Sequence, residues 1–163
     1  MNIVLTGMSG CGKTSVAGVF KSLGKTAVDT DIIIERKYGK IPEIFARYGE
    51  QYFRDLETKA IKEVSSLDGV VIATGGGCVL RSENVELLKS NGKIFYLRTK
   101  TATLLKRLDG DNSRPLLQGG TCEKLSKLYA ERAQLYESSA DYVIDTDEFT
   151  PEETVNKIME LII

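Results

Sequence analysis

The sequence GMSGCGKT occupies residues 7–14, close to the start of the chain. A short apolar and β-branched segment at residues 2–6 precedes it, and residues 13–23 carry apolar side chains at helical spacing. The stretch matches G-x-x-x-x-G-K-[ST], the P-loop, which lies between a strand and a helix. Glycine lets successive backbone N–H groups curl around phosphate oxygens, and the helix directs its N-terminal dipole at the anion. We therefore expect the phosphates of a nucleoside triphosphate to bind here.

Two side chains of this motif can contact the nucleotide or its metal ion. Lys13 can reach the β- and γ-phosphates, and Thr14 can offer its hydroxyl to Mg²⁺. The nucleotide-binding residues that we expect in the loop are Gly10, Cys11, Gly12, Lys13, Thr14 and Ser15. The guanine-specific sequence N-K-x-D is not present, and the small size of the chain suits a kinase that acts on a metabolite or a nucleotide.

Composition restricts the class of protein. A length of 163 residues suggests one domain, and 42% hydrophobic with 28% charged residues indicates a soluble globular protein. The net charge of -1, with no basic stripe, argues against nucleic acid as the main partner. The three cysteines have no metal-binding spacing, so we expect free thiols in a reducing compartment. Neither a signal peptide nor a membrane span is evident, which favours a cytoplasmic location. The chain has no histidine, so no catalytic step can use a histidine base.

Apolar segments that alternate with helical patterns predict an α/β fold. We expect strands at residues 2–6, 26–28, 70–73, 93–97 and 141–144. Helices are expected between and after them, at 13–23, up to 38, 42–48, 50–66, 82–90, 101–108, 122–139 and 151–161, with Ser82 as an N-cap. This alternation predicts a parallel sheet with helices on both faces. Residues 109–120 read as a long loop, and loops of that length are often lids or binding loops.

Two aspartates, Asp29 and Asp31, follow the second expected strand. Ligands of open α/β sheets bind beyond the carboxyl ends of the strands. One carboxylate could hold Mg²⁺ through water, and the other could accept a proton from a substrate hydroxyl. Aspartates in this position also cap helices, so the residues alone leave both interpretations open.

Further candidates are two arginines on separate helices, Arg54 and Arg132. If they converge on one site, their paired N–H groups would clamp a carboxylate, whereas each alone reads as a solvated surface residue. Three glycines, Gly75, Gly76 and Gly77, follow the third expected strand and would let a ligand touch backbone, unless they only form a turn. Arg114 lies in the long loop, where it could fold over a transferring phosphate or remain an ordinary surface residue.

The order of these motifs resembles the shikimate kinase family. The resemblance covers nearly the whole chain, through GMSGCGKT, VDTD at 28–31, IFARYGEQYFRDLE at 44–57, ATGGG at 73–77, RPLL at 114–117 and ERAQLYE at 131–137. A P-loop alone is specific only to a superfamily, whereas the ordered set is far more specific. The resemblance implies Mg·ATP-dependent phosphorylation of the 3-hydroxyl of shikimate, in the biosynthesis of chorismate and aromatic amino acids. It also implies the fold of the nucleoside monophosphate kinases, with a shikimate-binding segment at about 30–60 and a lid at about 109–121.

The resemblance also implies a role for each matching residue. Asp31 would bind the shikimate hydroxyls and act as the base, and Asp29 would support Mg²⁺ together with Thr14. Lys13 and Arg114 would stabilise the phosphoryl group during transfer, and Arg107 and Pro151 would flank adenine. The remaining residues of the expected shikimate site are Phe45, Phe53, Arg54, Gly75, Gly76, Gly77 and Arg132.

Two alternatives share the P-loop. One is another small-molecule kinase, such as a gluconate or nucleoside monophosphate kinase, and the other is a nucleotide-binding regulatory module without catalysis. The stretch TDEFT at 146–150 is acidic where relatives often carry basic residues near the adenine, which affects the expected ATP affinity and not the reaction. We expect a monomer that uses a small-molecule substrate and has no nucleic-acid or membrane partner.

Overall fold

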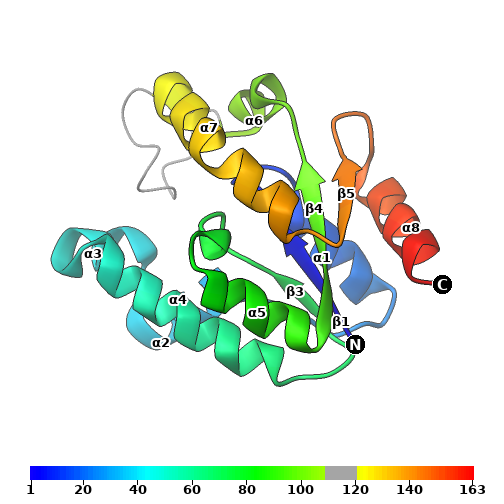
Figure 1. Cartoon of the computed structure of the whole chain (residues 1–163), viewed down its shortest axis with the longest axis horizontal. Coiled ribbons are helices and arrows are strands. Elements are labelled where there is room, and N and C mark those ends of the chain that lie inside the picture. Colours follow the sequence, from blue (N-terminus) through cyan, green and yellow to red (C-terminus); the bar gives the residue numbers. More distant parts are fainter. Residues whose placement is uncertain (109–120) are drawn as a thin grey trace.

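A computed structural model describes residues 1–108 and 121–163 (Figure 1). Its centre is a parallel sheet with the order β2-β3-β1-β4-β5. The strands are β1 (Asn2–Thr6), β2 (Ala27–Asp29), β3 (Val71–Ala73), β4 (Gly92–Arg98) and β5 (Tyr142–Asp145). The central strand β1 pairs with β3 on one side and β4 on the other, and all five of its residues are buried. The α/β prediction with five parallel strands is confirmed.

Helices connect the strands and cover both faces of the sheet. They are α1 (Lys13–Ser22), α2 (Thr30–Tyr38), α3 (Ile41–Tyr48), α4 (Glu50–Ser65), α5 (Ser82–Ser90), α6 (Thr101–Leu108), α7 (Thr121–Ser139) and α8 (Pro151–Ile162). Helices α1 and α8 pack together on one face, and α4, α5 and α7 lie toward the other (Figure 1). Right-handed crossovers of this kind bring the carboxyl ends of all parallel strands to one edge, where the loops that bear motifs begin.

The helices α2, α3 and α4 form a lobe beside the sheet with a small core of its own (Figure 1). Five buried side chains make up this core: Ile34, Ile44, Phe53, Leu56 and Ala60. A larger cluster between the sheet and its helices is separate from it and includes Phe20, Ile61 and Phe95. The lobe therefore has packing of its own, and α4 joins it to the main core, to which this helix contributes Ile61.

Two local details differ from the sequence prediction. Ser82 is the first residue of α5, and the N-cap is Arg81, which has extended backbone and makes no capping bond through its side chain. The prediction of Ser82 as an N-cap is therefore wrong by one residue, because helix ends depend on backbone geometry that a single residue type does not determine. A short 3₁₀ helix at Cys78–Leu80 follows the glycines and was not predicted.

The three cysteines agree with the expectation of free thiols. Cys11, Cys78 and Cys122 are all free, and burial raises the pKa of Cys78 to about 12, so that its thiol stays protonated. Within residues 1–108 and 121–163, no helix combines the length and apolar character that crossing a membrane requires. The loop expected at 109–120 lies outside the described residues.

The lobe core predicts a clear stability difference between two isoleucines of α2. Ile34 is 0% exposed and Ile32 is 40% exposed. We expect Ile34→Ala to lower the free energy of unfolding by about 2–5 kcal/mol, because it leaves a cavity in the lobe. Ile32→Ala, the matched control, should cost at most about 1 kcal/mol. Urea denaturation followed by circular dichroism measures both, and equal losses would contradict the described packing.

Candidate active site

The P-loop has a backbone that only glycine can adopt at several positions. Gly7, Gly10 and Gly12 all have positive φ angles, of 142°, 86° and 103°. A Cβ on Gly7 would lie 2.7 Å from Cys11 Sγ and 2.8 Å from the carbonyl oxygen of Leu97. The loop therefore packs tightly against the end of β4, and the protein alone determines its shape.

Lys13 is the first residue of α1, and its ammonium group lies against the loop. Its Nζ donates hydrogen bonds to the carbonyl oxygens of Gly7 at 2.6 Å and Met8 at 3.1 Å. The side chain is only 9% exposed. A buried ammonium held by carbonyl dipoles places a full positive charge within the loop, where an anion would be attracted.

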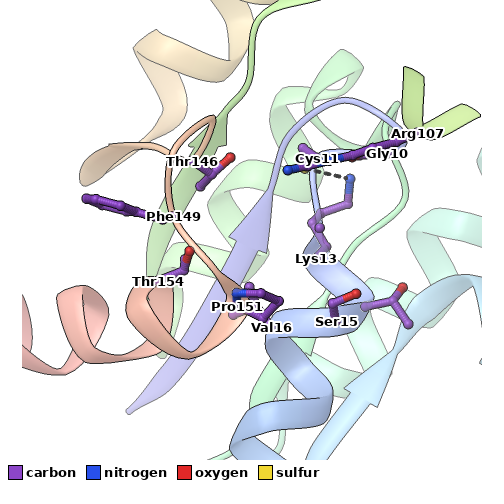
Figure 2. Close-up of a pocket in the computed structure, with 12 residues that line it drawn as sticks. Gly10, Cys11, Lys13, Ser15, Val16, Arg107, Thr146, Phe149, Pro151 and Thr154 are labelled. Carbon is purple, nitrogen blue, oxygen red and sulfur yellow. Dashed lines mark hydrogen bonds between the residues drawn. The ribbon is translucent and has the colours of Figure 1, made fainter. Parts of the chain in front are cut away.

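A cavity of about 500 Å³ opens beside the loop, between the start of α1 and the start of α8 (Figure 2). All of the predicted nucleotide residues among the described residues line it: Gly10, Cys11, Gly12, Lys13, Thr14, Ser15, Arg107 and Pro151. Arg107 reaches it from α6 and donates a hydrogen bond from Nη1 to the carbonyl oxygen of Gly10 at 3.0 Å. The cavity is large enough for a nucleoside, since sites for small ligands begin at about 300 Å³.

Four further residues line this cavity that sequence reasoning did not assign to it: Val16, Thr146, Phe149 and Thr154. Three of them come from the segment that follows β5 and from the first turn of α8. For residues 146–150 the resemblance indicated a place near the adenine, but it gave no single residue of that stretch a role. In Figure 2 the ring of Phe149 extends away from Lys13, whereas Thr146 and Thr154 border the cavity.

One carboxylate of the acidic stretch at 146–150 is held by local hydrogen bonds. Asp147 accepts hydrogen bonds from the backbone N–H of Lys100 at 2.9 Å and the hydroxyl of Thr103 at 2.8 Å. Its carboxylate thus sits at the start of α6, where the helix dipole favours negative charge.

Asp29 caps a helix, which is one of the two interpretations that the sequence left open. Its Oδ1 accepts the N–H groups of Asp31 at 2.9 Å and Ile32 at 3.2 Å, so it is the N-cap of α2. Its Oδ2 lies 3.4 Å from Thr14 Oγ1. Among the described residues no group of three or more Cys, Asp or Glu side chains could hold a metal ion. A cation at Asp29 and Thr14 would therefore take most of its ligands from phosphate and water, as Mg²⁺ commonly does.

The three glycines after β3 form a turn, here called the glycine turn (Gly75, Gly76 and Gly77), that three charged side chains approach closely. A Cβ on Gly75 would lie 2.7 Å from Asp31 Oδ1, and one on Gly77 would lie 2.5 Å from Arg54 Cζ. One on Gly76 would lie 3.6 Å from Arg132 Nη1. Residues from α2, α4 and α7 thus meet at a single stretch of backbone that has no side chains of its own.

Both arginines are buried, which excludes the alternative of solvated surface residues. Arg54 and Arg132 are each 6% exposed. Arg54 donates from Nη1 to Glu57 Oε1 at 3.0 Å, and its Nε lies 3.4 Å from Glu50 Oε2. Buried guanidinium groups are rare unless they are paired or bind an anion. Two guanidinium groups at the glycine turn offer several N–H donors that suit a carboxylate ligand, although nearby carboxylates offset part of their charge.

Glu57 is a member of this cluster that sequence reasoning did not assign to the site. It is 0% exposed, and its Oε2 would lie 2.8 Å from a Cβ on Gly75. Burial raises the pKa of Glu57, and the positive charges of Arg54, Arg132 and Arg81 oppose that rise. The spacing of Arg54 and Glu57 on one helical face was the available signal, although spacing alone does not reveal burial.

The two expected pocket phenylalanines lie in the lobe. The rings of Phe45 and Phe53 are 5.0 Å apart and tilted by 48°. Phe53 is buried in the lobe core, and Phe45 packs against that core from a partly buried position. The Arg54 guanidinium lies 5.2 Å from the ring of Phe53, which links the lobe core to the cluster at the glycine turn. Arg114, expected to contact the phosphates, lies outside the described residues.

Comparison with known proteins assigns the family. The family model described as shikimate kinase matches residues 9–163. A shikimate kinase of Thermodesulfovibrio yellowstonii is 47% identical over 98% of this chain and 93% of its own length. One from Caldicellulosiruptor bescii is 44% identical over 98% of this chain and 94% of its own length. The chain belongs to the shikimate kinase family.

Solved structures agree at the level of the fold. A shikimate kinase from Acinetobacter baumannii in complex with shikimate has a TM-score of 0.94 and 40% identity, with 99% of this chain and 92% of that chain covered. A deoxyadenosine kinase from M. mycoides with bound dATP has a TM-score of 0.63 at 19% identity, with 99% of both chains covered, and so shares the fold alone. Membership of the shikimate kinase family makes this chain a nucleotide-using kinase.

The close approach at the glycine turn predicts opposite effects for two Gly→Ala substitutions. Gly77 has an ordinary φ of -97°, so alanine there meets Arg54 without straining the backbone. We expect Gly77→Ala to lower the free energy of unfolding by about 1–3 kcal/mol as Arg54 is displaced. Gly18→Ala is the control, because nothing lies within 4 Å of its Cβ position in α1, and it should raise stability by about 0.5–1 kcal/mol. Chemical denaturation measures both, and a neutral Gly77→Ala would refute the described contact.

Proposed function

We propose that this chain transfers the γ-phosphoryl group of ATP to the 3-hydroxyl of shikimate, giving shikimate 3-phosphate and ADP. The observation that carries the proposal is the meeting of Asp31, Arg54 and Arg132 at the glycine turn. This combination offers two guanidinium groups for a carboxylate and one carboxylate for hydroxyls, which matches the chemistry of shikimate. The similar structure from Acinetobacter baumannii, which is in complex with shikimate, supports the same choice of acceptor.

Arg54 and Arg132 bind the carboxylate of shikimate in this proposal. Guanidinium groups can donate two parallel N–H bonds to a carboxylate, which fixes both its position and its orientation. Glu57 holds Arg54 by a 3.0 Å bond, so that the guanidinium is positioned before the acceptor arrives. The backbone of Gly75, Gly76 and Gly77 and the rings of Phe45 and Phe53 complete the acceptor site, within a shikimate-binding segment at about 30–60.

ATP occupies the cavity beside the P-loop in this proposal. Its phosphates lie against the backbone N–H groups of residues 10–15, and Lys13 turns its ammonium group from the loop carbonyls to the β- and γ-phosphate oxygens. Arg107 and Pro151 flank the adenine, since both line the cavity, Arg107 from α6 and Pro151 from the start of α8. Arg114 adds positive charge at the transferring phosphoryl group from the lid at about 109–121.

Mg²⁺ fits the pair formed by Thr14 and Asp29. These residues offer a hydroxyl and a carboxylate oxygen 3.4 Å apart at the edge of the P-loop, and hard oxygen donors are the ligands that this ion prefers. When bound, the ion neutralises charge on the phosphates and orients them. Asp29 is held for this purpose by its capping bonds at the start of α2.

Asp31 accepts the proton of the shikimate 3-hydroxyl. It belongs to the first turn of α2 and its carboxylate lies against Gly75, at the sheet edge where the P-loop also begins. Phosphoryl transfer requires little covalent help from the protein, so one positioned carboxylate and several positive charges are sufficient. A chain without histidine can therefore carry out this reaction.

The proposed reaction belongs to the pathway that leads to chorismate and the aromatic amino acids. The substrate and product are small and anionic, and the reaction uses cytoplasmic ATP. We propose a cytoplasmic monomer, a single kinase domain over residues 1–163, with no nucleic-acid or membrane partner.

The direct test is release of ADP from Mg·ATP with and without shikimate. We expect release that depends strongly on shikimate, and a pyruvate kinase–lactate dehydrogenase assay measures it. A panel of gluconate, nucleoside monophosphates and quinate serves as control. If a panel member is phosphorylated and shikimate is not, that compound class and not shikimate is the acceptor. If the protein binds ATP but phosphorylates no acceptor, it is a nucleotide-binding module without catalysis.

Substitution of Asp31 tests its role as the base. Asp31→Asn keeps the shape of the side chain but cannot accept the proton, so we expect kcat to fall by about 10²–10⁴-fold while ATP binding is retained. Steady-state kinetics and calorimetric titration with ATP measure the two quantities. Asp55→Asn, on an exposed position of α4, is the control. Near-normal turnover by Asp31→Asn would exclude the role.

Substitution of Arg54 tests recognition of the carboxylate. We expect Arg54→Ala to weaken shikimate binding by about 2–5 kcal/mol, because it removes a buried charge partner. The control is Arg47→Ala, an exposed arginine of α3 in the same lobe, which should leave binding unchanged. Calorimetry with shikimate measures both variants. An unchanged affinity in Arg54→Ala would argue that another group holds the carboxylate.

A further inference from the structure

The phenol of Tyr136 makes a bond to the glycine turn that has no assigned role. Tyr136 belongs to α7 and is 0% exposed. Its hydroxyl donates a hydrogen bond to the carbonyl oxygen of Gly76 and lies 3.6 Å from the sulfur of Met8 in the P-loop. A single buried hydroxyl therefore touches both the glycine turn and the P-loop.

The ring of Tyr136 is fixed by its packing. It stacks on the ring of Tyr96 with centroids 5.0 Å apart and planes 21° from parallel. Tyr96 is 1% exposed and belongs to β4, next to the central strand. Because the pair is buried in the main core, the hydroxyl has a defined position relative to the sheet.

The hydroxyl of Tyr136 remains a hydrogen-bond donor at neutral pH. Burial raises the pKa of this phenol, and this effect outweighs the nearby positive charge of Arg132, which lowers the pKa. The group therefore stays protonated at neutral pH and keeps its bond to Gly76. Without that bond, a backbone carbonyl in the centre of the site would lose its partner in the described structure.

Arg132 lies one helical turn before Tyr136 on α7. Its Nη1 lies 3.6 Å from the Cβ position of Gly76, the residue whose carbonyl Tyr136 holds. Two other bonds anchor the preceding residues of the turn: the hydroxyl of Thr74 donates to the carbonyl of Leu5 at 2.8 Å, and the N–H of Gly75 donates to the hydroxyl of Thr30 at 3.3 Å. Tyr136 thus provides the anchor on the side of the turn that faces α7.

We propose that Tyr136 is a positioning residue, whose hydroxyl fixes the carbonyl of Gly76 and so aligns the glycine turn with Arg132 for the acceptor. This inference rests on the proposed function, in which that turn and Arg132 bind shikimate. The phenol does not contact the nucleotide cavity, because its lining does not include Tyr136. Loss of the hydroxyl should therefore affect the acceptor more than ATP.

The test compares Tyr136→Phe with Tyr96→Phe. Each substitution removes one hydroxyl from the same stacked ring pair and keeps the packing, but only the first removes the bond to Gly76. We expect Tyr136→Phe to raise KM for shikimate about tenfold, consistent with loss of a buried hydrogen bond, and to leave KM for ATP within about twofold. Tyr96→Phe should change both by less than about twofold.

Amide hydrogen exchange of the unliganded protein gives a second readout that needs no substrate. In Tyr136→Phe, we expect faster exchange in a peptide spanning residues 74–80, with unchanged exchange in α8, and neither effect in Tyr96→Phe. Unchanged exchange at 74–80, or equal increases of KM for both substrates, would overturn the proposal. A wild-type enzyme that ignores shikimate would refute the proposed function instead, and the exchange result would still decide whether Tyr136 holds the turn.

Discussion

The absence of side chains at Gly75, Gly76 and Gly77 is the constraint on which the proposed acceptor site depends. Charged groups from α2 and α4 come so near this turn that a single methyl group would overlap them. Two carboxylates and two guanidinium groups can share a small, mostly buried volume only when no side chain separates them and their charges compensate one another. The sheet supplies the rest, because β3 delivers the turn to the same edge as the P-loop.

Much of the fold could be predicted from the sequence because its signals are local. The P-loop lies between an apolar strand and an amphipathic helix, and each later strand is a short apolar run that ends near a glycine or a charged residue. Boundaries agreed within one or two residues for most elements. The exception at Ser82 arose because the residue type fits both an N-cap and a first helical position, and only the backbone angles of Arg81 distinguish them.

The site was harder to predict, since its contacts join residues that are distant in sequence. Spacing could place Arg54 and Glu57 on one face, yet only packing shows that this face is buried and that Arg132 approaches the same turn. The hydroxyl of Tyr136 reaches a carbonyl 60 residues away, and no local pattern predicts such a bond. Asp29 illustrates a different limit: its motif fits both a helix cap and a magnesium ligand, and the structure shows the cap through Oδ1 while Oδ2 lies beside Thr14.

The two halves of the site are built in different ways, and this has a consequence for how each tolerates change. The proposed nucleotide half is mainly one continuous loop, so its geometry is set by local φ angles at Gly7, Gly10 and Gly12. The acceptor half is assembled from helices of the lobe, the turn after β3 and α7, which meet only through tertiary packing. A shift in any of these elements alters the distance between the two arginines, whereas the φ angles of the P-loop glycines are set within the loop. Acceptor recognition should therefore respond to substitutions far from the ligand, whereas nucleotide binding responds mainly to changes within the loop itself.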